Sequence, residues 1–216
     1  MEQVLGIMKS VVVGRLIESQ VKMLGSGFII TNDGKIVTTR HVIGDSNRDI
    51  VAIIDTVSAL FDYQDITNTC CSVMPVRIVE VDPFRDIAIL KADMQVPGGF
   101  AKIASLDAAA VGSDVVIIGY PHCVEGRKVL TIQRTEIGAK IIMQCQNIKS
   151  KYAVLNIQTR PGQSGSVVFS RDCQLILGLI IGSFAPDSGI SLGGINPREL
   201  NQTTHCISAE YLNDML

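Results

Sequence analysis

Residues 25–43 read GSGFIITNDGKIVTTRHVI, with two apolar runs on either side of Asn32-Asp33-Gly34. Short runs of β-branched residues around such a tripeptide are typical of a β-hairpin. Comparable runs recur along the whole chain, at 11–13, 28–30, 35–38, 50–54, 76–81, 87–91, 115–119, 128–133, 139–143, 153–157, 166–169 and 175–181. About a dozen short strands with little helix indicate an all-β protein, built as barrels or as one large sandwich.

The chain divides best near its middle. Segment 93–104 contains Pro97, Gly98 and Gly99 and interrupts the rhythm of strands. We therefore predict two six-stranded antiparallel β-barrels, residues 1–97 and 98–216, although the strand pattern alone does not separate them from a sandwich. Short terminal helices are predicted over 1–10 and from Ala209 onward, with Ser208 placed to cap the second.

Composition excludes several classes of protein. The 216 residues carry 19 Lys and Arg against 21 Asp and Glu, a formal charge of −2, which argues against a dedicated nucleic-acid binder. The chain has no tryptophan, and a mean hydropathy of +0.32 is that of a packed globule. The longest uncharged apolar stretch, 175–185, is far shorter than the about 20 residues of a membrane span. Since Glu2, Lys9 and Arg15 interrupt any signal-peptide core, we predict a cytoplasmic protein with no membrane partner.

Six cysteines stand at positions 70, 71, 123, 145, 173 and 206. In a chain of this size without an export signal, we predict reduced, structural thiols. A metal site is the alternative, because His122-Cys123 and His205-Cys206 are adjacent pairs of donors. However, neighbours on a strand point to opposite faces and no Cys-x-x-Cys occurs, so neither a metal nor a cofactor is predicted.

Ser164 lies in the segment RPGQSGS, residues 160–166, directly before an apolar strand. A serine hydroxyl becomes a nucleophile when a base removes its proton, and the tetrahedral intermediate needs two hydrogen-bond donors. Gly162 allows a backbone turn in which the N–H groups of Gly162 and Ser164 converge, and Gly165 leaves room for a substrate. Alone, so short a segment is more often a glycine-rich hairpin with serine turn formers.

Two further residues supply the partners of such a serine. His41, one of three histidines with His122 and His205, stands where a strand ends. Asp86 begins another apolar strand, where a carboxylate can orient an imidazole and stabilise its protonated form. Each alone has a plainer interpretation, a partly buried histidine and a strand-capping aspartate. Together with Ser164 they follow the chain order of the chymotrypsin triad and would meet at the seam between the two halves.

Six blocks of sequence carry a resemblance to a known family: GSGFIITNDGKIVTTRHVI (25–43), DIAILKAD (86–93), VVIIGYP (115–121), PGQSGSVVF (161–169), LILGLIIGS (175–183) and HCISAEYL (205–212). In this order the chain resembles a trypsin-like serine protease, most of all the protease domain of the HtrA (Deg) type. The resemblance implies two six-stranded β-barrels and hydrolysis of peptide bonds. It implies His41 as general base, Asp86 as its orienting group, Ser164 as nucleophile, and the N–H groups of Gly162 and Ser164 as oxyanion hole.

Several residues depart from the family pattern. Ser166 replaces a glycine after the nucleophile, and Arg40 replaces a small residue before the histidine. Gln163 stands where trypsin-type zymogens have an aspartate that pairs with a freshly cut N-terminus, so we predict no activation by N-terminal cleavage. The cysteines that flank the histidine in secreted relatives are absent, and we expect no PDZ domain in this chain. Restraint would then act on the barrels themselves or come from another chain.

The resemblance also places the substrate. Ile181, Gly182 and Ser183 are expected on the edge that pairs with the substrate backbone, by addition of a β-strand. Gln158, Thr159, Arg160 and Pro161, with segment 181–184, are expected to wall the primary specificity pocket. They offer no carboxylate for Lys or Arg. Arg160 or His205 would favour an acidic side chain, but each is more simply solvated or structural, so a small or medium uncharged residue is the first expectation.

The sequence thus predicts a serine endopeptidase that acts on polypeptide substrates through an acyl-enzyme. The alternative is a catalytically silent, protease-like module that binds peptides. A third hypothesis keeps catalysis but requires an activator protein or a homo-oligomer to order residues 161–164.

Overall fold

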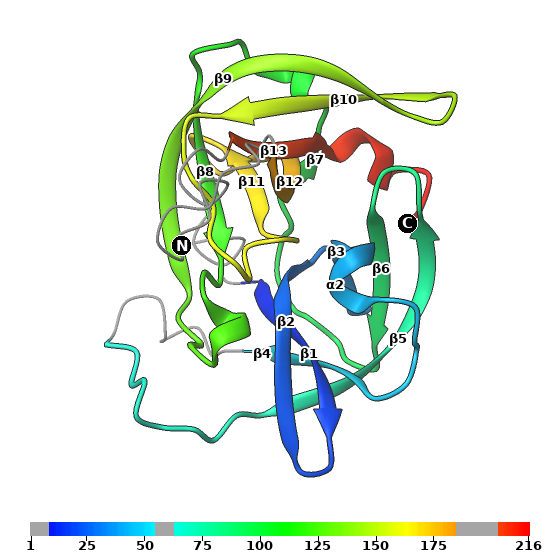
Figure 1. Cartoon of the computed structure of the whole chain (residues 1–216), viewed down its shortest axis with the longest axis vertical. Helices are drawn as coiled ribbons and strands as arrows, with labels where there is room; N and C mark the ends of the chain where they lie inside the picture. The colour runs from blue at the N-terminus through cyan, green and yellow to red at the C-terminus, as the bar shows by residue number, and fades with distance from the viewer. Residues whose placement is uncertain (1–8, 55–62, 185–202) are drawn as a thin grey trace, which may run out of the picture.

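The computed structural model describes residues 9–54, 63–184 and 203–216, and two β-barrels make up nearly all of them (Figure 1). Antiparallel strands close the first barrel in the order β1-β2-β3-β6-β5-β4. Its strands are β1 (Ser10–Ile17), β2 (Gln20–Ile29), β3 (Lys35–Thr39), β4 (Ile50–Ile54), β5 (Val73–Asp82) and β6 (Ile87–Ala92). The predicted hairpin is confirmed: β2 and β3 pair around a turn in which Gly34 has a φ of 85°.

The second barrel follows the order β11-β8-β9-β10-β13-β12 and is closed by pairing of β11 with β12. Its strands are β8 (Asp114–Gly119), β9 (Thr131–Cys145), β10 (Ile148–Leu155), β11 (Val167–Ser170), β12 (Leu175–Phe184) and β13 (Thr203–Ser208). A short strand outside this ring, β7 (Lys102–Ile103), pairs in parallel with β12. The prediction of two six-stranded antiparallel barrels is therefore confirmed, and the sandwich is wrong.

Some local predictions differ from the structure. The runs 128–133 and 139–143, predicted as two strands, belong largely to the single strand β9, because its first part pairs with β8 and its second part with β10. Ser208 precedes the short helix η5 (Ala209–Leu212) without capping it through its side chain, since its hydroxyl accepts the Leu106 N–H at 3.0 Å. Of the helix predicted over 1–10, residues 1–8 lie outside the described residues, and Ser10 begins β1.

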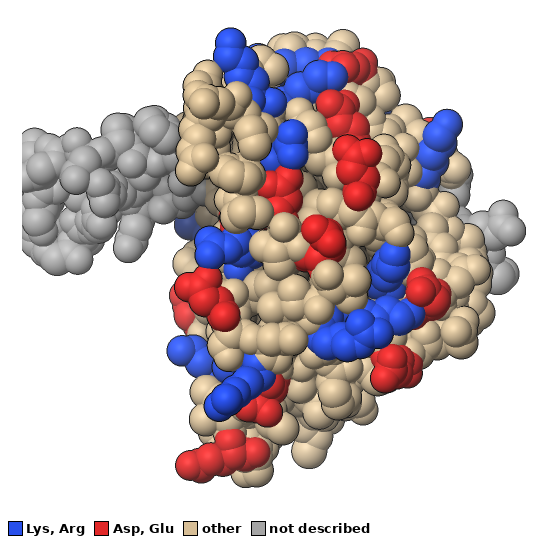
Figure 2. Space-filling view, turned by 90° about the vertical axis from the view of Figure 1, so that its right-hand side faces the viewer, with Lys and Arg blue, Asp and Glu red and all other residues tan. Residues whose placement is uncertain are grey.

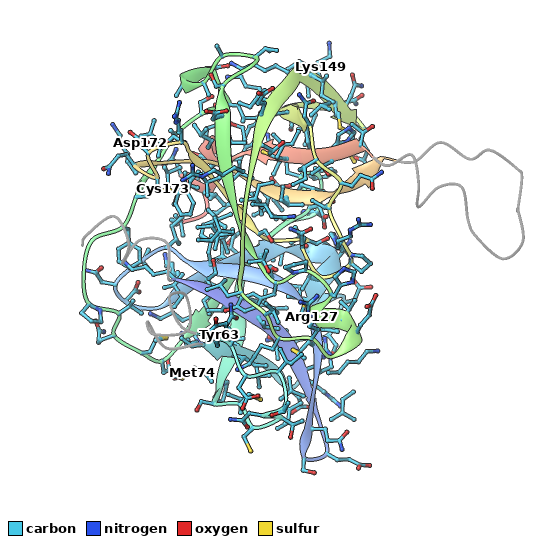
Figure 3. All side chains as sticks on the ribbon, turned by 90° about the vertical axis from the view of Figure 1, so that its left-hand side faces the viewer. Tyr63, Met74, Arg127, Lys149, Asp172 and Cys173 are labelled. Atoms are coloured by element: carbon cyan, nitrogen blue, oxygen red, sulfur yellow. The ribbon has the colours of Figure 1, made fainter. Side chains whose placement is uncertain are left out.

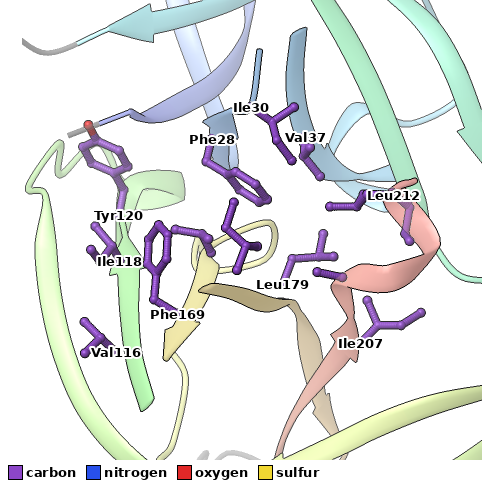
Figure 4. Packing of buried hydrophobic residues seen from close by; sticks show 14 of the residues in the cluster. Phe28, Ile30, Val37, Val116, Ile118, Tyr120, Phe169, Leu179, Ile207 and Leu212 are labelled. Carbon is purple, nitrogen blue, oxygen red and sulfur yellow. The ribbon is translucent and has the colours of Figure 1, made fainter. Parts of the chain in front are cut away.

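The segment between β6 and β7 connects the barrels, and the predicted boundary at 97/98 falls within it. A single cluster of buried apolar side chains spans the seam (Figure 4). Phe28 and Val37 come from the first barrel, and Phe169, Leu179 and Leu212 come from the second. Burial of apolar area fixes the barrels against each other, so loops from both are held at one seam.

Candidate active site

His41 and Asp86 are joined where strands β3 and β6 lie side by side. Thr39 ends β3, and the helical turn α2 (Arg40–Ile43) that follows carries His41. Thr39 pairs with Ile87, so the adjacent Asp86 faces the histidine. One oxygen of the Asp86 carboxylate accepts the His41 backbone N–H at 2.9 Å, and the other lies 2.5 Å from His41 Nδ1. A carboxylate only accepts, so the proton of the neutral ring sits on Nδ1 and Nε2 keeps its lone pair.

The Ser164 loop connects β10 to β11 and needs two glycines in the left-handed region. Gly162 has a φ of 92° and Gly165 a φ of 86°. The N–H groups of Gln163, Gly165 and Ser166 all donate to backbone carbonyls. Those of Gly162 and Ser164 have no acceptor within the described ranges, which leaves two donors of one turn for an external oxygen.

Ser164 and Val42, the residue after His41, border the same glycine of β2, Gly25. A Cβ atom placed on Gly25 would lie 2.6 Å from a methyl group of Val42, the residue after His41, and 3.2 Å from the Ser164 carbonyl oxygen. The Ser164 hydroxyl donates to the Ile181 carbonyl oxygen at 3.3 Å, and no hydrogen bond joins it to His41 in the described structure. The structure therefore joins His41 to Asp86 and places the Ser164 backbone near the residue after His41, with the serine hydroxyl turned toward β12.

Gln163 anchors the Ser164 loop within the second barrel. Its side chain is buried, with 1% of the residue exposed. Its Oε1 accepts the Arg160 backbone N–H at 2.7 Å, and its Nε2 donates to Gln133 Oε1 on β9. An uncharged amide thus holds the loop at the position where trypsin-type zymogens have an aspartate that pairs with a new N-terminus.

The other two departures also have a structural setting. The exposed Arg40 side chain forms an ion pair with Asp45, with nitrogen and oxygen 2.7 Å apart. Ser166 is fully buried, and its hydroxyl has no hydrogen-bond partner in the described structure. It packs against Gly119, where a Cβ atom would lie 1.9 Å from its oxygen, so glycine at 119 makes room for serine at 166.

The predicted substrate residues flank the Ser164 loop. Ile181, Gly182 and Ser183 continue β12, and the β12–β13 register shifts between Ile180 and Gly182. Beyond Leu179, the opposite edge of β12 has no strand partner among the described residues.

On the other side of the loop, Gln158, Arg160 and Pro161 are exposed. Thr159 is buried and donates its N–H to the Thr204 hydroxyl at 3.0 Å. Residues 185–202, between β12 and β13, lie outside the described residues.

The remaining donor side chains take ordinary structural positions. All six cysteines are free, and burial raises the pKa values of Cys123 and Cys206 to about 12. Cys173, beside Asp172 in the turn between β11 and β12 (Figure 3), has its pKa raised by burial and by that neighbouring charge. His122 Nδ1 lies 3.2 Å from Glu125.

Burial lowers the pKa of His205. No three His, Cys, Asp or Glu side chains of the described segments converge as metal ligands.

Surface charge and helix length relate to binding of nucleic acids and membranes. Acidic and basic side chains are interspersed over the face shown in Figure 2, without a broad basic area. In the part of the chain that the structure describes, every helix is too short or too polar to span a bilayer.

Sequence reasoning missed Ser26, which the structure places beneath the Ser164 loop. Ser26 is fully buried, and its hydroxyl donates to the Gly162 carbonyl oxygen at 2.8 Å. The available signal was a polar residue between two glycines, Gly25 and Gly27, inside a strand.

Sequence comparisons match the chain to peptidases. A family model described as trypsin-like peptidase domain matches residues 25–179. The chain is 28% identical over 163 residues to a probable periplasmic serine endoprotease, DegP-like, of Rickettsia prowazekii. The matched region covers 76% of this chain and 29% of that protein. The chain is 32% identical over 120 residues to the magnetosome formation protease MamE of Magnetospirillum gryphiswaldense, covering 56% of this chain and 14% of that protein. The chain thus spans less than a third of the length of these relatives.

Solved structures share the fold. The crystal structure of the MamO protease domain from Magnetospirillum magneticum superimposes with a TM-score of 0.70 and 14% identity, covering 98% of this chain and 97% of that one. The active form of the Rv3671c protease from M. tuberculosis gives a TM-score of 0.67 and 20% identity over 97% of this chain and 79% of that one. At these identities the likeness shows the two-barrel fold, and the family match confirms the resemblance predicted from sequence.

Proposed function

The chain belongs to the trypsin-like peptidase family, and we propose that it is a serine endopeptidase that cleaves polypeptides through an acyl-enzyme. The observation that carries the proposal is the double contact of Asp86 with the backbone N–H and Nδ1 of His41. This contact fixes the ring and its tautomer and leaves Nε2 as a base at the seam that also holds Ser164.

The chemistry uses groups of both barrels. For attack, the Ser164 hydroxyl leaves the Ile181 carbonyl, and its proton passes to His41 Nε2 as the oxygen bonds to the scissile carbonyl carbon. Asp86 stabilises the resulting imidazolium, while the N–H groups of Gly162 and Ser164 donate to the oxyanion. Collapse of the tetrahedral intermediate releases the amine, which takes the proton from His41. A water molecule then attacks the acyl-enzyme ester by the same steps, which releases the acid and restores the Ser164 hydroxyl.

The substrate is proposed to lie along β12. An extended peptide can add to the edge of β12 at Gly182 and Ser183 that has no strand partner among the described residues, where main-chain hydrogen bonds give affinity with little side-chain selectivity. Gln158, Thr159, Arg160 and Pro161 would line the pocket for the residue before the cleaved bond. They bring no carboxylate, so we propose a small or medium uncharged residue there.

The resting position of the serine hydroxyl favours a second candidate. Because Ser164 donates to Ile181 rather than to His41, the triad is incomplete in this conformation. Either the substrate turns the hydroxyl on binding, or an activator protein or a second copy of the chain is needed. In a module that only binds peptides, the Ser164 hydroxyl would never rotate toward His41.

A proteome-derived peptide library tests the proposal directly. Wild-type protein is expected to cleave it, and Ser164→Ala should lower turnover by roughly six orders of magnitude. Ser166→Ala is the matched control, because it removes another serine hydroxyl of the same loop that has no partner in the described structure. Wild-type protein that binds library peptides as well as Ser164→Ala does, with no cleavage by either, would identify a binding module.

We also propose a cytoplasmic location. Cys70, Cys71 and Cys145 are exposed free thiols, which an oxidising compartment would tend to pair. Cell fractionation with alkylation of acid-quenched protein tests this. The protein should appear in the cytoplasmic fraction with all six thiols alkylated, whereas a periplasmic fraction would refute the location.

A further inference from the structure

Ser26 lies on β2 of the first barrel, but most of its hydrogen bonds cross the seam. Its N–H donates to the Ser164 carbonyl oxygen at 2.9 Å, and its hydroxyl donates to the Gly162 carbonyl oxygen at 2.8 Å. The same hydroxyl accepts the Tyr120 N–H at 2.9 Å. Within its own barrel, the Ser26 carbonyl accepts the Thr38 hydroxyl at 2.7 Å, and Ser26 pairs with Val12 of β1.

We propose that Ser26 is a positioning residue of the oxyanion hole. Its hydroxyl holds the Gly162 carbonyl and so fixes the turn that presents the N–H groups of Gly162 and Ser164. The inference rests on the proposed function and deepens it, because it assigns part of the transition-state geometry to a residue of the opposite barrel that never touches the substrate.

The geometry around Gly162 supports this role. Each peptide group is planar, so holding one of its ends orients the other. The peptide before Gly162 is held at the Pro161 carbonyl, which accepts the His122 N–H at 2.6 Å. The peptide after it is held at the Gly162 carbonyl by Ser26 and at the Gln163 N–H, which donates to Arg160 at 3.1 Å. With both peptides fixed, Gly162 keeps its φ of 92° and its N–H stays directed away from these partners.

A hydroxyl is well suited to this position because it donates one hydrogen bond while accepting another. Alanine would leave the buried Tyr120 N–H and the Gly162 carbonyl without it. That carbonyl also accepts the Cys123 thiol, whose sulfur lies 3.7 Å away, but a thiol donates weakly.

Two glycines make room for this contact. A Cβ atom on Gly165 would lie 2.0 Å from the Ser26 carbonyl oxygen, and one on Gly119 would lie 3.0 Å from its hydroxyl. The 2.0 Å distance leaves no space for a side chain at 165, and the 3.0 Å distance at 119 is tighter than most Cβ contacts, so the nucleophile loop and the end of β8 both pack closely against Ser26.

Ser26→Ala tests the inference, since it removes the hydroxyl and keeps both backbone hydrogen bonds of residue 26. We expect kcat to fall roughly ten- to hundred-fold with little change in KM, somewhat less than the loss of an oxyanion donor itself. Affinity for a peptide boronate, which forms a tetrahedral adduct, should fall in step with kcat/KM, while that of a product peptide stays unchanged. Ser166→Ala, which removes an equally buried hydroxyl that lacks a partner in the described structure, should keep the wild-type kcat.

A purely structural role gives a different pattern. It lowers the melting temperature of Ser26→Ala but leaves kcat and boronate affinity unchanged below that temperature, a result that would overturn the inference. Ser26→Cys, which keeps a weak donor, should give a kcat between those of serine and alanine, and it carries the test if the alanine variant does not fold. If the wild type is active and Ser26→Cys has the wild-type kcat, the inference alone is overturned. A wild type that stays inactive toward the peptide library, at high protein concentration as well, would overturn the proposed function too.

Discussion

Gln163→Glu tests how the nucleophile loop is held. The change keeps the shape of the side chain and the Oε1 that accepts the Arg160 N–H, but it replaces the Nε2 that donates to Gln133. An ionised glutamate would set two acceptor oxygens against each other at a position with 1% exposure. The folded variant therefore favours the protonated acid, which still has a donor for Gln133.

The size of the effect follows from linkage. Glutamate ordinarily titrates near pH 4.3, so holding it protonated at pH 7 costs about 3.7 kcal/mol, at 1.36 kcal/mol per pH unit. The variant has a pKa raised in the folded state. Its stability should therefore match that of the wild type below about pH 4 and fall as the pH rises, until the pH passes the folded pKa. If the folded pKa of the glutamate lies below 7, the loss of unfolding free energy stops at less than this 3.7 kcal/mol.

Urea unfolding and kcat at several pH values between 5 and 8 measure this. We expect the free energy of unfolding of Gln163→Glu to decline with rising pH relative to the wild type, and kcat to fall only as the pH passes the folded pKa, where the acid loses the proton that it donates to Gln133. Gln144→Glu, at an exposed position on the same strand β9, is the control and should show neither decline. If Gln163→Glu keeps wild-type stability and kcat at pH 8, the amide does not anchor the loop as described.

Three further predictions concern the histidine–aspartate pair, the nucleophile loop and two buried thiols. Asp86→Asn should lower kcat by about four orders of magnitude with the fold intact, because an amide that donates to Nδ1 leaves Nε2 protonated and unable to act as base; steady-state kinetics and melting temperature together check this. Gly165→Ala should cost more than about 4 kcal/mol, since its φ is 86° and the new Cβ would lie 2.0 Å from the Ser26 carbonyl oxygen, and urea unfolding would contradict this by showing a stable variant. Burial raises the pKa values of the Cys123 and Cys206 thiols from 9.0 to about 12. Their contribution to stability is therefore complete below pH 9 and is lost as the pH rises toward 12, by about 1.4 kcal/mol per pH unit for each thiol. Unfolding free energies at pH 8 and 10.5, with and without alanine at both positions, measure this loss.

Much of the fold could be predicted from local patterns. The turn at Asn32-Asp33-Gly34 and the β-branched runs around it specify a hairpin through short-range geometry alone. The division of β9 could not be foreseen in the same way, because one continuous strand serves two neighbours, and pairing partners are a property of the closed barrel. Sequence position predicts that Ser208 caps the last helix, but its hydroxyl accepts the distant Leu106 N–H instead.

The site shows the same division. His41, Asp86 and Ser164 could be proposed from residue type, order and resemblance, and of these the structure joins His41 to Asp86 by hydrogen bonds. The anchoring contacts could not be predicted, because Gln133 and Ser26 lie far from residues 162–164 in sequence and carry no local pattern that assigns them to the loop. Their roles depend on how two barrels pack, which periodicity does not encode.

The most direct test of the central claim is labelling with a fluorophosphonate, followed by mass spectrometry of the digested protein. We expect one adduct, on Ser164, in the wild type, and none in Ser164→Ala. His41→Ala should label far more slowly, because the hydroxyl then lacks its base. Wild-type protein that stays unlabelled after incubation with peptide substrates and with concentrated protein would contradict the account, as would labelling of Ser164 that is indifferent to His41.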